Sequence, residues 1–580
     1  MQITATQPAS LDQQKSIKAA SRTRLPLLFI LIVLGAATVT FLDRPPRPLA
    51  KDVPTSVFSA ERSAEYLAVI ARAPHPINSP EHDAVRDYIV RTLQELGFDP
   101  QIQRTTDINE RYHVPGVLDN IVCRLKGSGS AKAILLDAHY DSVPAGPGAS
   151  DDGVAVASLL ETARILKQQP QLKRDVIFLF SDGEERGTLG ARAFVSEHPW
   201  ARDTGIVLNF EARGTTGPSI MFESSDDNGW IISNFAQATS NPVANSLSYE
   251  IYKRLPAGTD FTVFRRAGYS GLNFGFIDGF ANYHSPQDSV QNADHGSMQQ
   301  HGDYMLALTR HFGDLESDDP RPANAVYFDV LGKFLVRYGR SAASVFLVLT
   351  IAIVVAALTL GIRAKRLRIG ALLGGLASVI GGILTTVIAA LLLSLPILAI
   401  KGHLFKPPIG PIPDAGWYIM AFCAIGLACG MAFYLAMSKR LGAENLGAAA
   451  CIVWLALVTA VSIFLPGGTY LFLWPLLFVA LAWLVIFAGR HTTGSGATTA
   501  ILFVGSLPAV VIVMPMIRKI ASAFAAGSTV IVSLLLGLLL SLLIGPIILE
   551  TASKRWSLPV SFAAGGVGLL VAAFVISAMG

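Results

Sequence analysis

Eight long apolar stretches fill the C-terminal part of the sequence, from residue 342 to residue 580. Each is long enough to cross a bilayer as a helix, and short polar loops separate them. Their interiors contain no Asp, Glu, Lys, Arg or His, whereas ion-coupled transporters and proton pumps usually need such residues at membrane depth. We therefore predict an eight-helix transmembrane region at 342–580 that is an anchor or a partner-binding bundle rather than a transporter. The predicted spans are 342–362, 370–400, 417–437, 446–465, 469–488, 498–517, 522–549 and 559–579.

Another apolar stretch lies near the N-terminus, at residues 25–42, and follows a polar tail at residues 1–24. The tail contains four cations just before the stretch, which are Lys15, Lys18, Arg22 and Arg24. Cations at one end of a span favour the cytoplasmic side. We predict an uncleaved transmembrane anchor with a cytoplasmic tail, with a cleaved signal peptide as the alternative. Residues 51–320 then lie on the other side of the membrane.

The distribution of Lys and Arg between the loops tests this topology. Threading the spans from an exported domain places nine of these residues in cytoplasmic loops and four in outer loops, which agrees with the positive-inside rule. Arg518 and Lys519, which fall on the outer side, fit this pattern least well. The cytoplasmic set is Arg363, Lys365, Arg366, Arg368, Lys439, Arg440, Arg490, Lys554 and Arg555, and the outer set is Lys401, Lys406, Arg518 and Lys519.

Composition excludes some classes of protein. Charged residues make up 15% of the 580-residue chain, against about 25% in an average soluble domain, and the deficit is concentrated after residue 341. A net charge of +4 gives no reason to expect a nucleic-acid partner. Cys123 is the one cysteine before residue 341, so this part of the chain has no internal disulfide.

Residues 321–341 join the two halves of the chain. The apolar residues Val326, Phe328, Val330 and Phe334 fit an amphipathic segment that lies on the membrane surface. A plain linker helix is the other interpretation.

Residues 51–320 show the pattern of an α/β domain. Three short apolar runs, AILLDAHYDS, DVIFLFSD and GIVLNFEARG, are typical of strands that are buried on both faces. Helical patterns follow the first two runs. We predict a mixed, mostly parallel sheet flanked by helices, followed by the all-α transmembrane bundle. Such sheets bind ligands at the carboxyl ends of their strands.

Acidic residues and histidines recur at these predicted strand ends. His139 and Asp141 lie two positions apart, so both side chains share one face of a strand. One residue could bind a metal while the other orients it, because a metal-bound histidine usually donates its second N–H to a carboxylate. In isolation, a structural His–Asp pair is the more common explanation.

Three further motifs extend the set. Asp151 and Asp152 follow a Gly/Pro-rich loop and precede a helix, where an aspartate can cap the helix or bind a cation. Glu184 and Glu185 end a buried strand, so that one could bind metal while the other acts as a general base; a solvated turn is the alternative. Glu211 ends the next strand, and His284 lies in the loop YHSPQDS. Two histidines with several carboxylates suit a pair of zinc ions.

The motifs HYDS, GASDDGVA, EERGTLGARAF, NFEARG, TDFTVF and YHSPQD resemble, as a set, those of the co-catalytic zinc aminopeptidases. This family includes leucyl aminopeptidases, glutamate carboxypeptidases and the Fxna-type membrane metallopeptidases. The layout of one anchor, a peptidase domain and many C-terminal spans is most similar to the Fxna-type branch of the endoplasmic reticulum and vacuole. The resemblance covers about residues 60–310.

The resemblance implies a role for each candidate residue. Asp151 would bridge two Zn²⁺, one bound by Glu185 and His284 and the other by His139 and Glu211. Glu184 would be the general base and Asp141 the orienting partner of His139. The peptide bond between Asp151 and Asp152 would be cis. Many well-known members carry aspartate where this chain has Glu211, which weakens any transfer of their substrate preference.

These observations predict a membrane-anchored di-zinc exopeptidase, with an aminopeptidase favoured, that hydrolyses peptide substrates outside the cytoplasm and contacts membrane lipid. Glu211 and Asp260 are candidates for binding the substrate amine. The alternatives are a non-catalytic receptor-like or scaffold ectodomain and a glutaminyl-cyclase-like acyltransferase. The compartment would be the bacterial inner membrane with a periplasmic catalytic domain, or the endoplasmic reticulum or vacuole membrane in a eukaryote.

Overall fold

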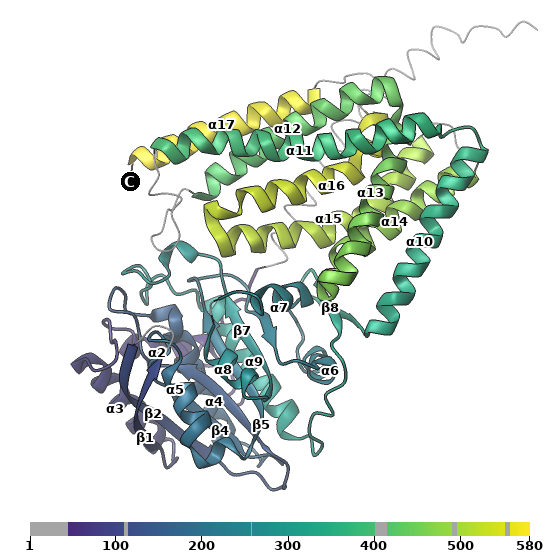
Figure 1. The fold of residues 1–580 in the computed structure, drawn as a ribbon. Helices are drawn as coiled ribbons and strands as arrows, with labels where there is room; N and C mark the ends of the chain where they lie inside the picture. Colours follow the sequence, from purple (N-terminus) through teal and green to yellow (C-terminus); the bar gives the residue numbers. More distant parts are fainter. Residues whose placement is uncertain are drawn as a thin grey trace, which may run out of the picture.

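The computed structural model describes residues 44–109, 114–256, 258–400, 415–489, 496–550 and 557–579. An α/β domain comprises the described residues up to about 320, and a bundle of long helices follows it (Figure 1). The predicted tail at 1–24 and anchor at 25–42 lie outside the described residues.

A seven-stranded sheet forms the centre of the α/β domain, with strand order β1-β2-β4-β3-β5-β7-β6. Strands β4, β3, β5 and β7 are parallel, while β1, β2 and β6 run antiparallel to their neighbours. The three apolar runs identified in the sequence are β3, β4 and β5, so the prediction of a mixed, mostly parallel sheet is confirmed. The strands are β1 Gln101–Asn109, β2 Val114–Leu125, β3 Ala133–His139, β4 Val176–Ser181, β5 Thr204–Ala212, β6 Ile220–Ser224 and β7 Ser270–Phe276.

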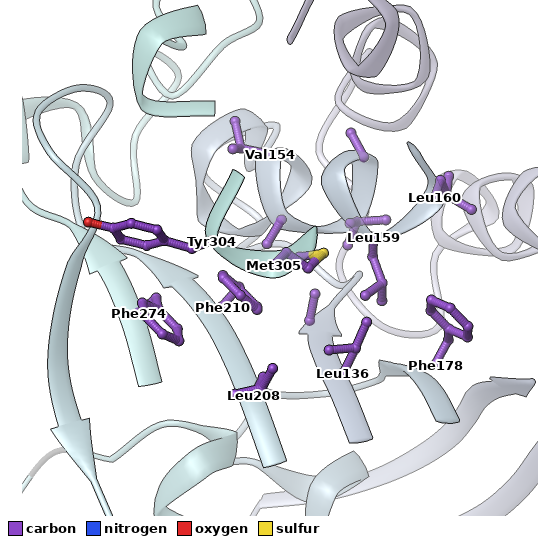
Figure 2. Close-up of a cluster of buried hydrophobic side chains, with 14 of the residues drawn as sticks. Leu136, Val154, Leu159, Leu160, Phe178, Leu208, Phe210, Phe274, Tyr304 and Met305 are labelled. Atoms are coloured by element: carbon purple, nitrogen blue, oxygen red, sulfur yellow. The ribbon is translucent and has the colours of Figure 1, made fainter. Parts of the chain in front are cut away.

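Helices cover both faces of this sheet, because alternate strand residues point to opposite sides. Leu136 and Phe178 face the layer of α2, α4 and α9, whereas their neighbours Leu135 and Ile177 face α5 and α8. Figure 2 shows the first of these cores, where strand residues such as Leu136 and Phe210 meet Met305 of α9. The helices are α2 Ala60–Ile70, α3 Pro80–Glu95, α4 Val154–Lys167, α5 Leu189–Glu197, α6 Gly229–Ala238, α7 Ser246–Tyr252, α8 Asp260–Arg266 and α9 His295–Gly313.

Eight helices coincide with the eight apolar stretches of the C-terminal region. Six of them, α10 to α15, contain described segments long and apolar enough to cross a membrane. The described apolar parts of α16 and α17, Thr529–Leu543 and Ser557–Ala573, are shorter, so eight crossings stay a prediction. The helices are α10 Arg340–Arg363, α11 Ile369–Ile400, α12 Ala415–Leu441, α13 Ala443–Phe464, α14 Tyr470–Ala488, α15 Gly496–Phe524, α16 Thr529–Glu550 and α17 Ser557–Met579.

The junction between the two regions is a β-hairpin, so the expectation of a helical linker is wrong. Strands β8 (Val326–Val330) and β9 (Phe334–Tyr338) pair antiparallel, and Leu331 and Gly332 in the turn have φ values of 55° and 62°. Alternation of Val326, Phe328 and Val330 has the period of two that is typical of a strand. Glycine adopts positive φ without steric cost, which suits this turn.

The hairpin and the helical bundle share one hydrophobic core. The rings of Phe328 in β8 and Tyr470 in α14 stack with centroids 4.7 Å apart. Ser246, which begins α7, donates its Oγ–H to the carbonyl oxygen of Gly467 at 2.6 Å. Leu247 belongs to the same buried cluster as the bundle residues. The bundle therefore packs directly on the α/β domain.

Two ion pairs add to this contact. They involve Arg518 and Lys519, the two cations that fit the predicted charge pattern least well. Arg518 Nη1 of α15 lies 2.8 Å from Asp278 Oδ2, in the loop after β7. Lys519 Nζ lies 3.2 Å from Asp329 Oδ1 in β8. Arg518 therefore contacts the α/β domain, and Lys519 contacts the junction hairpin.

Candidate metal centre

The predicted ligands converge at the carboxyl ends of the parallel strands. His139 is the last residue of β3, and Glu211 is the penultimate residue of β5. Glu185 lies in the turn after β4, and His284 lies in the loop after β7. Asp151 lies in the irregular turn Ala149–Gly153 just before α4, where its own backbone is not helical. Since these strands are parallel, residues distant in sequence meet at one edge of the sheet.

Two groups of potential metal ligands share Asp151. His139, Asp151 and Glu211 form one group and Asp151, Glu185 and His284 form the other, with the ligand atoms of each group within 4.8 Å of one another. Oδ1 of Asp151 faces His139 Nε2 at 3.3 Å, while Oδ2 faces His284 Nε2 at 3.1 Å. Each Asp151 oxygen thus faces a different group, as a bridging carboxylate requires.

Asp141 holds the histidine and the neighbouring glutamates together. Nδ1 of His139 lies 3.0 Å from the carbonyl oxygen of Asp141 and 3.4 Å from its Oδ1. A proton on Nδ1 would leave Nε2 available to bind a metal. The Asp141 carboxylate also accepts the backbone N–H groups of Glu184 at 3.0 Å and Glu185 at 3.3 Å. One side chain therefore fixes the end of β3 to the turn after β4.

A second carboxylate, Asp288, supports the bridging aspartate, and we did not predict it. Its two oxygens accept the backbone N–H groups of Ser150 at 2.7 Å and Asp151 at 3.2 Å. The peptide bond between Asp151 and Asp152 is cis, as the resemblance implied. Asp288 belongs to the motif YHSPQD, so its place four residues after His284 was the available signal.

The electrostatics of the site suit a divalent cation. Burial, together with the neighbouring carboxylates, raises the pKa of Glu184 and of Glu211 well above its usual range. Burial also raises the pKa of Glu185 to about 7. Burial alone would lower the pKa of His284, but its hydrogen bonds to Asp151 and Glu185 raise it to about 10. Buried carboxylates in such excess are stable as anions only when cations compensate them.

A cavity of about 1030 Å³ opens onto this site. Glu184 lines it together with the ligands Asp151, Glu185 and Glu211. Other parts of its wall come from the turn after β4 with Arg192 of α5, the end of β5 with Arg213, β6, the segment of α7 and α8, the loop that carries Tyr283, and the end of α15. Glu184 is thus open to the cavity, whereas Asp141 lies behind the ligands and is 1% exposed.

Asp260 lies beneath the ligands and does not line the cavity. It is 1% exposed and accepts a hydrogen bond from Ser181 Oγ at 2.5 Å. The neighbouring Asp137 is fully buried, and burial raises its pKa well above the usual range. This geometry does not support a contact between Asp260 and a substrate amine. The contact stays a prediction.

This chain is similar in sequence to known proteins. Residues 120–309 match the model of peptidase family M28. A vacuolar membrane protease of Candida albicans is 32% identical over 348 residues, which cover 58% of this chain and 40% of that protein. Endoplasmic reticulum metallopeptidase 1 of Mus musculus is 28% identical over 57% of this chain and 40% of its own length. Among solved structures, an aminopeptidase from Aneurinibacillus sp. strain AM-1 aligns with a TM-score of 0.39 and 13% identity, over 47% of this chain and 98% of that one.

The family match lies within the α/β domain. It begins in β2 and ends in α9, so it includes every proposed ligand. The chain spans about 40% of the length of the curated relatives that it matches. Residues 120–309 therefore resemble peptidase family M28, and the resemblance seen in the motifs is confirmed over this segment.

Proposed function

We propose that this chain is a membrane-bound zinc peptidase that binds two Zn²⁺ and removes residues from the amino termini of peptides, with its active site outside the cytoplasm. One observation carries the proposal: two groups of three potential ligands share Asp151, and their carboxylates Asp151, Glu185 and Glu211 line a cavity that Glu184 also lines. The M28 domain and the helices α10 to α15 agree with a membrane-bound peptidase.

The residues present fit the two metal ions. His139 and Glu211 would hold one ion, Glu185 and His284 would hold the other, and Asp151 would bind both through its separate oxygens. Imidazole nitrogen and carboxylate oxygen are the usual ligands of catalytic zinc. When bound, a zinc pair lowers the pKa of a coordinated water and polarises the scissile carbonyl.

The side chains of the protein would move the protons. Glu184 is the carboxylate that lines the cavity without belonging to either ligand group. It would accept a proton from the attacking water and deliver it to the leaving amine. Asp141 would position this base, because it accepts the N–H of Glu184 while it fixes His139.

The membrane topology is part of the proposal. The α/β domain would lie on the outer side, because the positive-inside pattern places most loop cations of the bundle on the other side. The cations of α15 that depart from this pattern are paired with Asp278 of the α/β domain and with Asp329 of the junction hairpin.

Hydrolysis of unblocked dipeptides by the purified full chain tests the proposed chemistry. Glu184→Gln should lower kcat by about 10²–10⁴-fold while zinc content stays unchanged. Glu197→Gln, an exposed position in α5, is the matched control and should retain activity. Equal activity of Glu184→Gln and the wild type would contradict the general-base role. Release of ammonia from peptides with N-terminal glutamine, without peptide hydrolysis, would support the cyclase alternative instead.

A further inference from the structure

A helix of the membrane bundle lines part of the cavity at the proposed active site. Met516, Ile520 and Phe524 of α15 line the same cavity as the proposed ligands Glu185 and Glu211. Figure 1 shows α15 on the side of the bundle that faces the α/β domain. The cavity therefore continues from the carboxylates of the catalytic domain to a helix of the bundle.

The position of α15 against this cavity is fixed from several sides. Met516 and Ile520 are 6% and 8% exposed and belong to the buried core of the bundle. The residues between them, Arg518 and Lys519, form the ion pairs with Asp278 and Asp329. Buried packing together with two ion pairs holds this turn of the helix in one place.

Apolar residues outside the bundle also line this cavity. They are Phe222 of β6, Ile251 of α7 and Ile277 after β7. The lining also includes charged residues, among them Lys519 of α15 and the carboxylates of the proposed metal site. A peptide with a free amine near the metal site would place a neighbouring side chain against these apolar residues. Burial of apolar area there favours large apolar side chains.

We propose that α15 forms the specificity wall of the substrate site, where Ile520 and Phe524 select peptides with a bulky apolar side chain next to the scissile bond. This inference rests on the proposed peptidase function and adds to it a substrate class and a role for the bundle. A peptide is the proposed occupant, because the same cavity is lined by the carboxylates of the proposed peptidase site and by α15. A lipid acyl chain is the competing occupant, and the tests below separate the two.

The first test compares hydrolysis of Ala-Ala, Leu-Ala and Ala-Leu by the full chain in detergent. The wild type should prefer at least one leucine-containing dipeptide, by kcat/KM, about 10-fold or more over Ala-Ala. Ile520→Ala and Phe524→Ala should each remove most of that preference and leave hydrolysis of Ala-Ala nearly unchanged. Phe524 is 37% exposed, so its truncation keeps the test valid if Ile520→Ala fails to fold.

Leu507→Ala is the matched control. Leu507 lies on the same helix, is 42% exposed and does not line the cavity. It is 13 residues from Ile520, or about 20 Å along the helix. The control should keep the wild-type preference, and an equal loss in Leu507→Ala and Ile520→Ala would overturn the proposal.

The second test measures occupancy without turnover. Ile520→Cys and Leu507→Cys are labelled with a small maleimide, with the wild type giving the background from Cys429, which is partly buried. Leu-Leu, added in excess to Glu184→Gln versions of these variants, should slow labelling at position 520 and leave position 507 unchanged. Unchanged labelling at both positions would overturn the proposal and favour a lipid acyl chain at this end of the cavity.

Failure of the proposed function has a different signature. If the wild type hydrolyses none of the dipeptides, the peptidase assignment fails, and protection of the cysteine at position 520 still decides whether a peptide occupies the wall. If the wild type hydrolyses them with the same preference as Ile520→Ala and Phe524→Ala, the peptidase assignment holds and the specificity wall is wrong.

Discussion

The α/β domain and the helical bundle differ in where they keep buried polar groups. The domain buries His139, Asp141, Asp151 and Glu211 together at the carboxyl ends of its strands. The helices α10 to α15 instead contain long apolar segments. Burial of an uncompensated charge is costly, so a cluster of buried carboxylates indicates ligand chemistry. An apolar helix indicates only that its surroundings are apolar, so its role has to be inferred from its contacts.

The largest effect is expected when Asp151, which both proposed ligand groups share, is replaced. Asp151→Asn should lose both metal ions and reduce hydrolysis to the background of the assay, since Asp151 belongs to both ligand groups. The helices of the bundle should keep their fold, because they lie outside the site. Zinc content and circular dichroism measure the two effects, and retention of two ions would refute the bridging role.

Removal of the metal should loosen the domain and leave the bundle unaffected. Ligands that bind only the native state stabilise it by about 2.7 kcal/mol at a concentration of 100 Kd. Treatment with a chelator should therefore speed amide hydrogen exchange in Ala149–Gly153 and in the turn at Glu184 and Glu185. The amides of α13 should be unaffected, and uniform acceleration in both regions would contradict a site confined to the α/β domain.

A smaller effect is expected from the residue behind the ligands. Asp141→Asn keeps the size of the side chain but weakens the acceptor for the backbone N–H groups of Glu184 and Glu185. Loss of such a supporting carboxylate typically costs about 10–100-fold in metal affinity or activity. Competition with a chromogenic chelator measures this affinity. Asp99→Asn, an exposed position just before β1, is the control and should match the wild type.

The smallest effect concerns the contact between the two regions. Arg518→Gln removes the ion pair with Asp278, in which the side chains are 27% and 19% exposed. Because partly exposed pairs contribute about 0–1 kcal/mol, the unfolding temperature should fall only slightly. A large loss of stability would show that the regions depend on each other more than a partly solvated pair explains.

Much of the candidate site was predictable because its signals are local. His139, Glu184, Glu185 and Glu211 each follow or end an apolar strand, and parallel strands bring their carboxyl ends together. Asp288 was missed, since its role is to accept backbone N–H groups of a loop 137 residues away. No local pattern reports such a contact.

The junction and the bundle show more clearly what could not be predicted from the sequence alone. The alternation of Val326, Phe328 and Val330 was the signal for β8, but the same residues also fit an amphipathic segment. The contacts of Arg518 and Lys519 join residues 240 and 190 positions apart. Such pairs form only when two folded regions pack against each other, so no local sequence pattern predicts them.

The most direct test of the central claim is the zinc content of the wild type beside His139→Ala and His284→Ala. Two groups that share Asp151 predict two ions per chain in the wild type. Each variant should lose the ion of its own group, so that about one ion per chain remains. One ion or none in the wild type, measured after purification with zinc present, would contradict the paired metal centre.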